Sequence, residues 1–210
     1  GGRDFFMPPH LPPIQSSSIA APFLNTGDLG FRRPQIERTT GTTGTYAQIA
    51  TVGANVMTYN NGALTDGTQY YYRVRAVNSG GNSAYSNAAA AITPLASPTA
   101  PTATAPTPSQ ITLTWTDQSA TETSFALERK LGSTGTYAQI ATVGANVTTF
   151  SDTGLTDGTR YYYRVRAVNA LTTSNYSAET SATTPLAVPG IPTGLTATAT
   201  SATVVSLSWP

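Results

Sequence analysis

The sequence predicts an all-β chain built of tandem β-sandwiches, and two observations support this prediction. The segment Thr43–Val56 (TGTYAQIATVGANV) recurs letter for letter as Thr134–Val147, at an offset of 91 residues, from position 43 to position 134. A period of this length fits a whole domain and is too long for one turn of a solenoid. Within one period, short runs of Thr, Val, Ile and Tyr are broken by Gly, Asn, Asp and Pro, which is typical of sandwich strands and turns.

The strands of the second period show the alternation expected of a sheet with one buried face. From Tyr161 to Ala167 (YYYRVRA), Tyr and aliphatic residues at odd-numbered positions alternate with Tyr162 and two arginines. The runs Ile111–Trp115 and Phe125–Leu127 alternate in the same way. Because side chains two residues apart lie on the same face of a strand, we expect one face to be core and the other to be solvated.

A set of residues in the second period carries a family resemblance. These residues are Trp115, Leu155, Asp157, Gly158, Tyr161, Tyr176, Ser177 and Thr183–Pro185. With them, residues 97–185 resemble the fibronectin type III family, in the style of its bacterial extracellular members. The resemblance implies an immunoglobulin-like sandwich with strands A, B and E facing strands C, C′, F and G. It also implies a tyrosine corner, in which the Tyr161 hydroxyl hydrogen-bonds back across the preceding turn, and a secreted or cell-surface protein.

The repeat divides the chain into four segments. Residues 1–34 are a Pro-rich N-terminal segment or degenerate strands A and B, and residues 35–94 hold strands C to G of a first repeat. Residues 95–185 form a complete second repeat, and residues 186–210 supply strands A and B of a third repeat. The first repeat thus lacks a clear A–B hairpin, and the third repeat is represented by that hairpin alone.

Composition argues against several classes of function. Charged residues make up 10% of the chain and the net charge is +1, so no strong field would attract nucleic acid. The chain has no run of about 18 apolar residues, and we expect no membrane insertion. Cysteine is absent, which excludes disulfides and thiolate metal sites.

The titratable residues do not form a pattern typical of catalysis. His10 is the single histidine and lies in a Pro-rich stretch, so no histidine-based nucleophile pair is available. Asp66, Asp152 and Asp157 are predicted to occupy turns, where aspartate serves the turn geometry. We expect a protein that is not an enzyme and that needs no metal and no cofactor.

Two aromatic residues, Tyr71 and Tyr162, are predicted to face outward from equivalent strands of the two repeats. Their rings could stack on a glycan or another partner, or they could pack against cross-strand neighbours. The second interpretation is favoured, because such packing is common on the exposed face of a sheet.

The two incomplete ends predict how copies of the chain meet. The hairpin residues Leu195, Val205, Leu207 and Trp209 of one copy would cover the otherwise open face formed in the next copy by Ile36, Tyr70, Tyr72 and Val74. Such a contact repeats from copy to copy and builds a filament. The leading hypothesis is therefore a non-enzymatic extracellular structural protein, a subunit of a surface fibre or of a tandem spacer array assembled head to tail.

Other interpretations of the ends stay open. Residues Met7–Pro34 could complete the first repeat in cis, with Ile19–Leu24 as its strand B. Alternatively, the chain is a piece of a longer array. It would then be an accessory, carbohydrate-binding or adhesion module excised from a larger secreted bacterial enzyme or adhesin, and its partners would be neighbouring repeats or a glycan.

Overall fold

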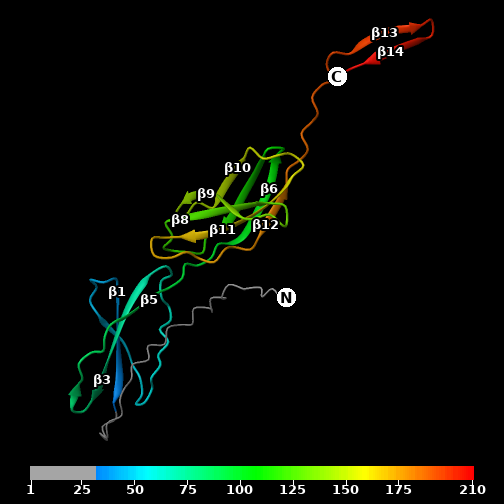
Figure 1. Cartoon of the computed structure of the whole chain (residues 1–210). Helices are drawn as coiled ribbons and strands as arrows, with labels where there is room; N and C mark the ends of the chain where they lie inside the picture. Colours follow the sequence, from blue (N-terminus) through cyan, green and yellow to red (C-terminus); the bar gives the residue numbers. More distant parts are fainter. Residues whose placement is uncertain (1–31) are drawn as a thin grey trace, which may run out of the picture.

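The structure is a computed structural model that describes residues 32–210, and antiparallel strands make up its regular elements. Two groups of strands and one separate hairpin follow one another along the molecule (Figure 1). No helix in residues 32–210 is long and apolar enough to cross a membrane. The strands are β1 (Arg33–Thr40), β2 (Ala47–Thr51), β3 (Gln69–Asn78), β4 (Gly81–Asn82), β5 (Ala89–Ile92), β6 (Thr99–Thr107), β7 (Gln110–Thr116), β8 (Ser124–Leu131), β9 (Ala138–Gly144), β10 (Thr149–Thr153), β11 (Arg160–Val168), β12 (Thr180–Thr183), β13 (Thr196–Ser201) and β14 (Val204–Ser208).

The second repeat is a sandwich of two antiparallel sheets. One sheet has the strand order β10-β7-β6 and the other has the order β12-β11-β8-β9. In chain order these strands correspond to E, B and A in the first sheet and to G, F, C and C′ in the second. The predicted fold class and the predicted division of strands between the two sheets are confirmed.

The core of this sandwich lies between its two sheets and contains the residues that the alternation places inward. Ile111, Phe125 and Leu127 are completely buried, as is all but 1% of Tyr163. Trp115 packs edge-on against Phe125, with ring centroids 5.7 Å apart. The two-residue period of a strand sends all of these side chains to one face, where they stabilise the sandwich by burying apolar surface.

Each repeat has the tyrosine corner that the family resemblance implies. In the second repeat, the backbone N–H of Thr156 donates a hydrogen bond to the Tyr161 hydroxyl at 3.1 Å. In the first repeat, the N–H of Thr65 donates to the Tyr70 hydroxyl at 3.0 Å. The turn before β3 is therefore stabilised by the same kind of hydrogen bond as the turn before β11.

The first repeat is a single sheet, with the order β2-β1-β3-β4 and with β5 also paired to β3. It differs in one element from the expected strands C to G, because residues 58–62 form no strand E. In the second repeat, the equivalent strand β10 pairs with β7. A strand needs a partner for its backbone hydrogen bonds, and the described part of the first repeat contains no counterpart of β7.

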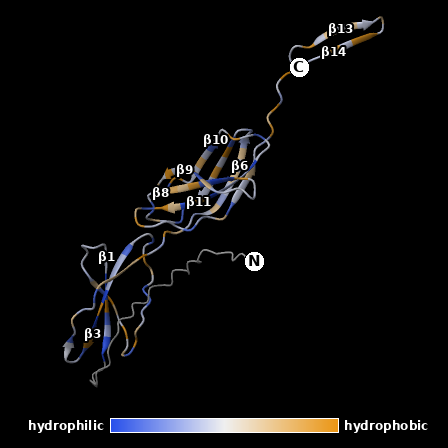
Figure 2. Ribbon diagram, in the orientation of Figure 1, coloured by the Kyte–Doolittle hydropathy of each residue, from blue (hydrophilic) through white to orange (hydrophobic). Residues whose placement is uncertain are grey.

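The segment predicted to begin a third repeat contains an isolated hairpin. Strands β13 and β14 pair only with each other, and all residues from Pro185 to Pro210 are exposed. Several of the exposed residues are apolar, as the hydropathy of the hairpin shows (Figure 2). The hairpin therefore has an apolar face with no second sheet packed against it.

Candidate functional site

A hydrogen-bonded junction centred on Asp66 joins the first repeat to the second. The carboxylate Oδ2 of Asp66 accepts a hydrogen bond from the backbone N–H of Ala96 at 3.0 Å and one from the Ser119 hydroxyl at 2.6 Å. The backbone carbonyl of Asp66 accepts another from the Thr121 hydroxyl at 2.8 Å. Asp66 lies in the turn before β3, whereas Ser119 and Thr121 lie in the turn between β7 and β8. The sequence predicted only a turn residue here, and the structure adds a contact between domains.

The surroundings of Asp66 favour its charged form. Partial burial raises the pKa of the carboxyl, but the hydrogen bonds from Ala96, Ser119, Ala120 and Thr121 lower it by more. The pKa of Asp66 therefore lies below its ordinary value. At neutral pH the junction holds an ionised carboxylate, which makes its hydrogen bonds stronger than those of a neutral acceptor.

The junction also depends on the absence of a side chain at Gly67. This glycine has a φ of +55°, and a Cβ atom there would lie 2.5 Å from the Leu95 side chain, 2.5 Å from Thr121 Oγ1 and 2.6 Å from Asn169 Nδ2. The Asn169 side chain donates a hydrogen bond to the Gly67 carbonyl at 3.0 Å. Leu95 belongs to the buried core cluster of the second sandwich. We call these residues, Asp66, Gly67, Leu95, Ala96, Ser119, Thr121 and Asn169, the Asp66 junction.

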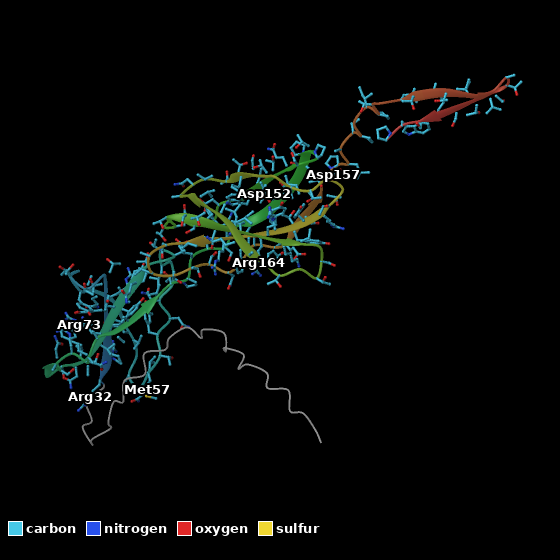
Figure 3. All side chains as sticks on the ribbon, turned by 45° about the horizontal axis from the view of Figure 1, so that its top comes forward. Arg32, Met57, Arg73, Asp152, Asp157 and Arg164 are labelled. Carbon is cyan, nitrogen blue, oxygen red and sulfur yellow. The ribbon has the colours of Figure 1, made fainter. Side chains whose placement is uncertain are left out.

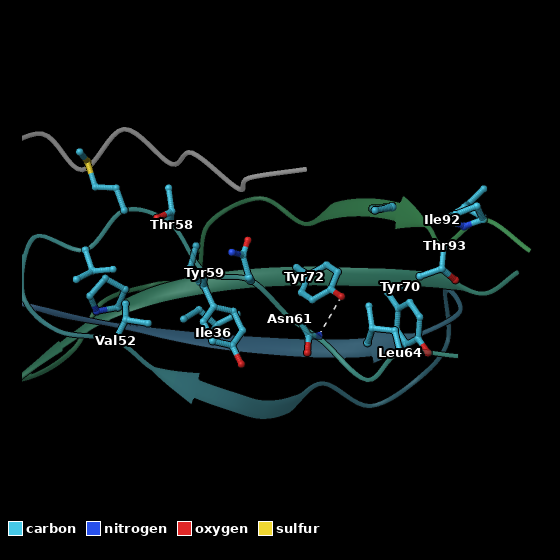
Figure 4. A pocket seen from close by; sticks show the side chains of 18 of the residues that line it. Ile36, Val52, Thr58, Tyr59, Asn61, Leu64, Tyr70, Tyr72, Ile92 and Thr93 are labelled. Atoms are coloured by element: carbon cyan, nitrogen blue, oxygen red, sulfur yellow. Dashed lines mark hydrogen bonds between the residues drawn. The ribbon is translucent and has the colours of Figure 1, made fainter. Parts of the chain in front are cut away.

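The residues predicted to receive a neighbouring hairpin lie together in the first repeat. Ile36, Tyr70, Tyr72 and Val74 form one buried cluster, against which Val52 and Leu64 pack. Their face is thus less open than the sequence analysis expected, although a cavity of about 680 Å³ remains beside it (Figure 4). Inside it, the Asn61 side chain donates a hydrogen bond to the Tyr72 hydroxyl at 3.0 Å. Most of its lining is apolar or aromatic.

The residues predicted to be donated lie on the hairpin, at the other end of the molecule (Figure 1). Leu195, Val205, Leu207 and Trp209 are between 55% and 65% exposed. The structure therefore presents both predicted contact sets but does not bring them together within one chain. The cis alternative, with Ile19–Leu24 as strand B, lies outside the described residues.

The two tyrosines considered for ligand stacking occupy equivalent half-buried positions. Tyr162 lies between the ammonium of Lys130, 5.0 Å from its ring centroid, and the guanidinium of Arg160, 5.1 Å away. Tyr71 faces Thr39 and Ala90 across the sheet. The Tyr162 ring is already in contact with two cations of its own domain, Lys130 on the neighbouring strand β8 and Arg160 on the same strand β11.

Sequence reasoning missed an ordered cluster of charged and aromatic side chains on the same sheet face. In the second repeat the Arg164 guanidinium lies 4.0 Å from the Tyr137 ring and 3.8 Å from the Tyr176 ring, and it pairs with Glu128 at 2.6 Å. In the first repeat Arg73 has equivalent contacts with Tyr46, Tyr85 and Glu37. The signal was present in the sequence, because all four residues recur at the offset of 91 positions. The arginines are therefore held by their own sheet.

Asp152 is not the turn residue that the sequence analysis expected. It lies in β10, is buried, and accepts hydrogen bonds from Arg129 at 2.8 Å and from the Tyr163 hydroxyl at 2.8 Å. Burial of an aspartate requires partners of this kind, so its role is to hold the two sheets together. No group of three or more His, Cys, Asp or Glu side chains within residues 32–210 could hold a metal ion. His10 lies outside the described residues.

Comparisons with known proteins agree with the sequence and the fold. Residues 96–183 match the family described as fibronectin type III domain. Exoglucanase B of Cellulomonas fimi is 33% identical over 172 residues, which cover 74% of this chain. The chain spans only 15% of the length of that relative.

A solved structure of two consecutive domains has the same fold. A segment of two fibronectin type III domains from chicken tenascin superposes with a TM-score of 0.62 at 18% identity, over 73% of this chain and 85% of that one. An Fn3-like protein from Clostridium thermocellum is 33% identical and covers 46% of this chain and 96% of that one, with a TM-score of 0.37. Residues 96–183 are therefore a fibronectin type III domain, and the whole chain has an all-β fold like that of two consecutive fibronectin type III domains.

Proposed function

We propose that the chain is a non-enzymatic spacer, an accessory module of a larger secreted bacterial protein such as a polysaccharide hydrolase. The observation that carries this proposal is the Asp66 junction, in which the turn before β3 is hydrogen-bonded to the linker and to the second sandwich. Domains joined by a flexible linker alone move independently. A junction of this kind holds the two repeats at a defined separation, as a spacer requires.

Two further observations support the spacer over a ligand-binding module. The relative that shares 172 residues with this chain is an exoglucanase, and those residues correspond to a small part of it. On the present chain, the exposed sheet face of the second sandwich is occupied by its own pairs of arginine, tyrosine and glutamate. A glycan stacked on Tyr162 would have to displace Lys130 and Arg160 from its ring.

The spacer proposal is tested by measuring the distance between the two repeats. Because the chain has no cysteine, Ala47→Cys on β2 and Ala138→Cys on β9 introduce two unique attachment points for spin labels on exposed residues. Pulsed electron paramagnetic resonance should give one narrow distance distribution. Asp66→Asn should broaden it, and the matched change Asp157→Asn should leave it unchanged. A broad distribution in the otherwise unaltered chain would contradict the proposal.

Two further tests address the absence of catalytic activity and the proposal that the chain belongs to a larger protein. The purified chain should release no reducing sugar from cellulose or soluble glucans. The reading frame that encodes the chain should also encode a catalytic domain. A reading frame that holds further repeats alone would favour the fibre instead.

A second candidate function is head-to-tail assembly by strand donation, as the fibre hypothesis holds. It is favoured by the cavity of about 680 Å³ beside Tyr70 and Tyr72 together with the exposed apolar face of the β13–β14 hairpin. The partner in this proposal is a second copy of the chain, whose hairpin would enter the cavity and supply strands A and B.

Strand donation predicts association that depends on concentration. Sedimentation velocity should show oligomers of the full chain, and Trp209→Ala should weaken their formation. Leu171→Ala, which removes another half-exposed apolar side chain from the second sandwich, is the control and should have no effect. A chain that remains monomeric at millimolar concentration would rule out strand donation without affecting the spacer proposal.

A further inference from the structure

The turn before β11 repeats the first half of the Asp66 junction. Asp157 Oδ2 accepts a hydrogen bond from the backbone N–H of Ala187 at 2.9 Å, as Asp66 does from Ala96 at 3.0 Å. Gly158 has a φ of +57°, close to the +55° of Gly67. Its N–H donates to the Pro185 carbonyl at 3.3 Å, and the Gly67 N–H donates to Pro94 at the same distance. The segment after the second repeat therefore makes the same backbone contacts with its Asp-Gly turn as the segment after the first repeat makes with the turn at Asp66.

The second half of the junction is not present at Asp157. Leu186 is 77% exposed, whereas its equivalent Leu95 is 3% exposed. A Cβ atom on Gly158 would meet only the Leu186 side chain, and the clashes that Thr121 and Asn169 cause at Gly67 have no counterpart there. Asp157 lies exposed on the surface of the second sandwich (Figure 3). We call Asp157, Gly158, Leu186 and Ala187 the Asp157 surface.

We propose that the Asp157 surface is the docking site for a following fibronectin type III sandwich, which binds through its turns between strands B and C and between strands F and G. This inference rests on the proposed spacer function and gives the spacer its second joint. The partner is defined by the residues that fill the same place at Asp66: a serine and a threonine hydroxyl in the B–C turn and a side-chain amide in the F–G turn.

Each proposed contact is inferred from the equivalent contact at the Asp66 junction. A serine equivalent to Ser119 donates to the free lone pairs of the Asp157 carboxylate, and a threonine equivalent to Thr121 donates to the Asp157 carbonyl. An amide equivalent to Asn169 donates to the Gly158 carbonyl. Leu186 enters the end of the partner core, as Leu95 does in the second sandwich, and this burial stabilises the docked arrangement.

The β13–β14 hairpin is the natural start of that partner, because it supplies strands of types A and B directly after the Asp157 surface. It does not dock by itself, since every residue from Pro185 onward is exposed. This agrees with the proposal, because the side-chain donors at the first junction come from the B–C and F–G turns and from neither strand A nor strand B.

The proposal can be tested with a chain in which a second copy of residues 97–185 follows Ala187 in place of residues 188–210. The sequence Pro-Leu-Ala precedes the sandwich in both places, as residues 94–96 and as residues 185–187. The added sandwich has the complete core described above and carries its own copies of Ser119, Thr121 and Asn169. Amide hydrogen exchange at Leu186 and Ala187 should slow by at least about tenfold relative to the original chain, as expected for docking that is worth one hydrogen bond to a charged group.

Two matched variants separate this inference from the spacer proposal. In the extended chain, Asp157→Asn should restore fast exchange at Leu186, whose N–H makes no hydrogen bond to Asp157, and Asp66→Asn should leave exchange at Leu186 unchanged. In the original chain, Asp157→Asn should leave the order between the first two repeats unchanged. If Leu186 and Ala187 exchange equally fast with and without the added sandwich, the docking site is wrong. The Asp66 variant still reports on the spacer in that case.

Discussion

At the scale of single residues, Gly67 and Gly158 show how the same local sequence can serve two surroundings. Both glycines follow an aspartate, both have a left-handed backbone conformation, and both precede a threonine that closes the turn. Only Gly67 is pressed against side chains of the next sandwich. The pair therefore separates the energetic effect of backbone strain from the effect of the contact between domains.

Alanine at the two positions should have different consequences. In both Gly67→Ala and Gly158→Ala, the left-handed conformation costs about 1–2 kcal/mol. Gly67→Ala should also widen the distance distribution between the repeats, because its Cβ atom would collide with Thr121 and Asn169. Urea denaturation and pulsed electron paramagnetic resonance measure the two effects. Equal broadening in both variants would contradict the close approach at Gly67.

The low pKa of Asp66 predicts that acid weakens the junction. Its carboxyl has a lower pKa in the folded protein than in the unfolded chain, so its contribution is present above the ordinary aspartate pKa and is lost as pH falls through the folded value. The distance distribution between the repeats should therefore broaden only below the ordinary aspartate range. In Asp66→Asn the distribution should be broad at neutral pH and should not change further in acid. The pKa values of Glu37 and Glu128 are also lowered. The Asp66→Asn variant therefore shows whether broadening in acid comes from Asp66 or from these two glutamates.

At the scale of elements, strand β7 illustrates what alternation in the sequence can predict. Trp115 ends its inward face and packs against Phe125, as the two-residue period indicates. Trp115→Ala should reduce the free energy of unfolding of the second sandwich by about 3–5 kcal/mol, through lost burial and the cavity that remains. Tyr161→Phe should cost only about 1 kcal/mol, because it removes one hydrogen bond and keeps the ring. Thermal unfolding measures both, and a wild-type melting temperature for Trp115→Ala would contradict the core assignment.

Local pattern predicted most strands of the two repeats, and it failed where an element depends on distant partners. Residues 58–62 resemble β10 in position but form no strand, because residues 32–94 contain no strand equivalent to β7, with which β10 pairs. Asp152 was assigned to a turn, since nothing local shows that Arg129 and Tyr163 reach it from other strands.

The candidate sites also differ in how far the local sequence pattern predicts them. The common face of Tyr70 and Tyr72 follows from the period of a strand, but the sequence predicted that this face is open, whereas the structure buries both residues in one cluster. The contact between Asp66 and Ser119 joins turns 53 residues apart in the chain, and its residues look like ordinary turn residues. The one signal for it was the repetition of Asp-Gly and Pro-Leu-Ala at the offset of 91 positions.

At the scale of the whole molecule, the two linkers should differ in their sensitivity to proteases. Leu95–Ala96 and Leu186–Ala187 are the same dipeptide, but only the first leucine is buried. Exposed, extended segments are the preferred sites of cleavage. Elastase, which cleaves after alanine, should therefore cut after Ala187 well before Ala96. Mass spectrometry of the fragments will show the order, and early cleavage at Ala96 would contradict a closed first junction.

The Asp66 junction also determines how the molecule responds to tension. A pulling force along the chain acts on the junction, where only a few side-chain hydrogen bonds and one buried leucine resist separation of the two repeats. Inside the second sandwich, the same force is resisted by whole ladders of backbone hydrogen bonds. The junction therefore opens first and lengthens the molecule while these ladders stay intact, and it closes again when the force falls. Such a joint would take up a sudden pull on the chain and leave the sheets of the second sandwich folded.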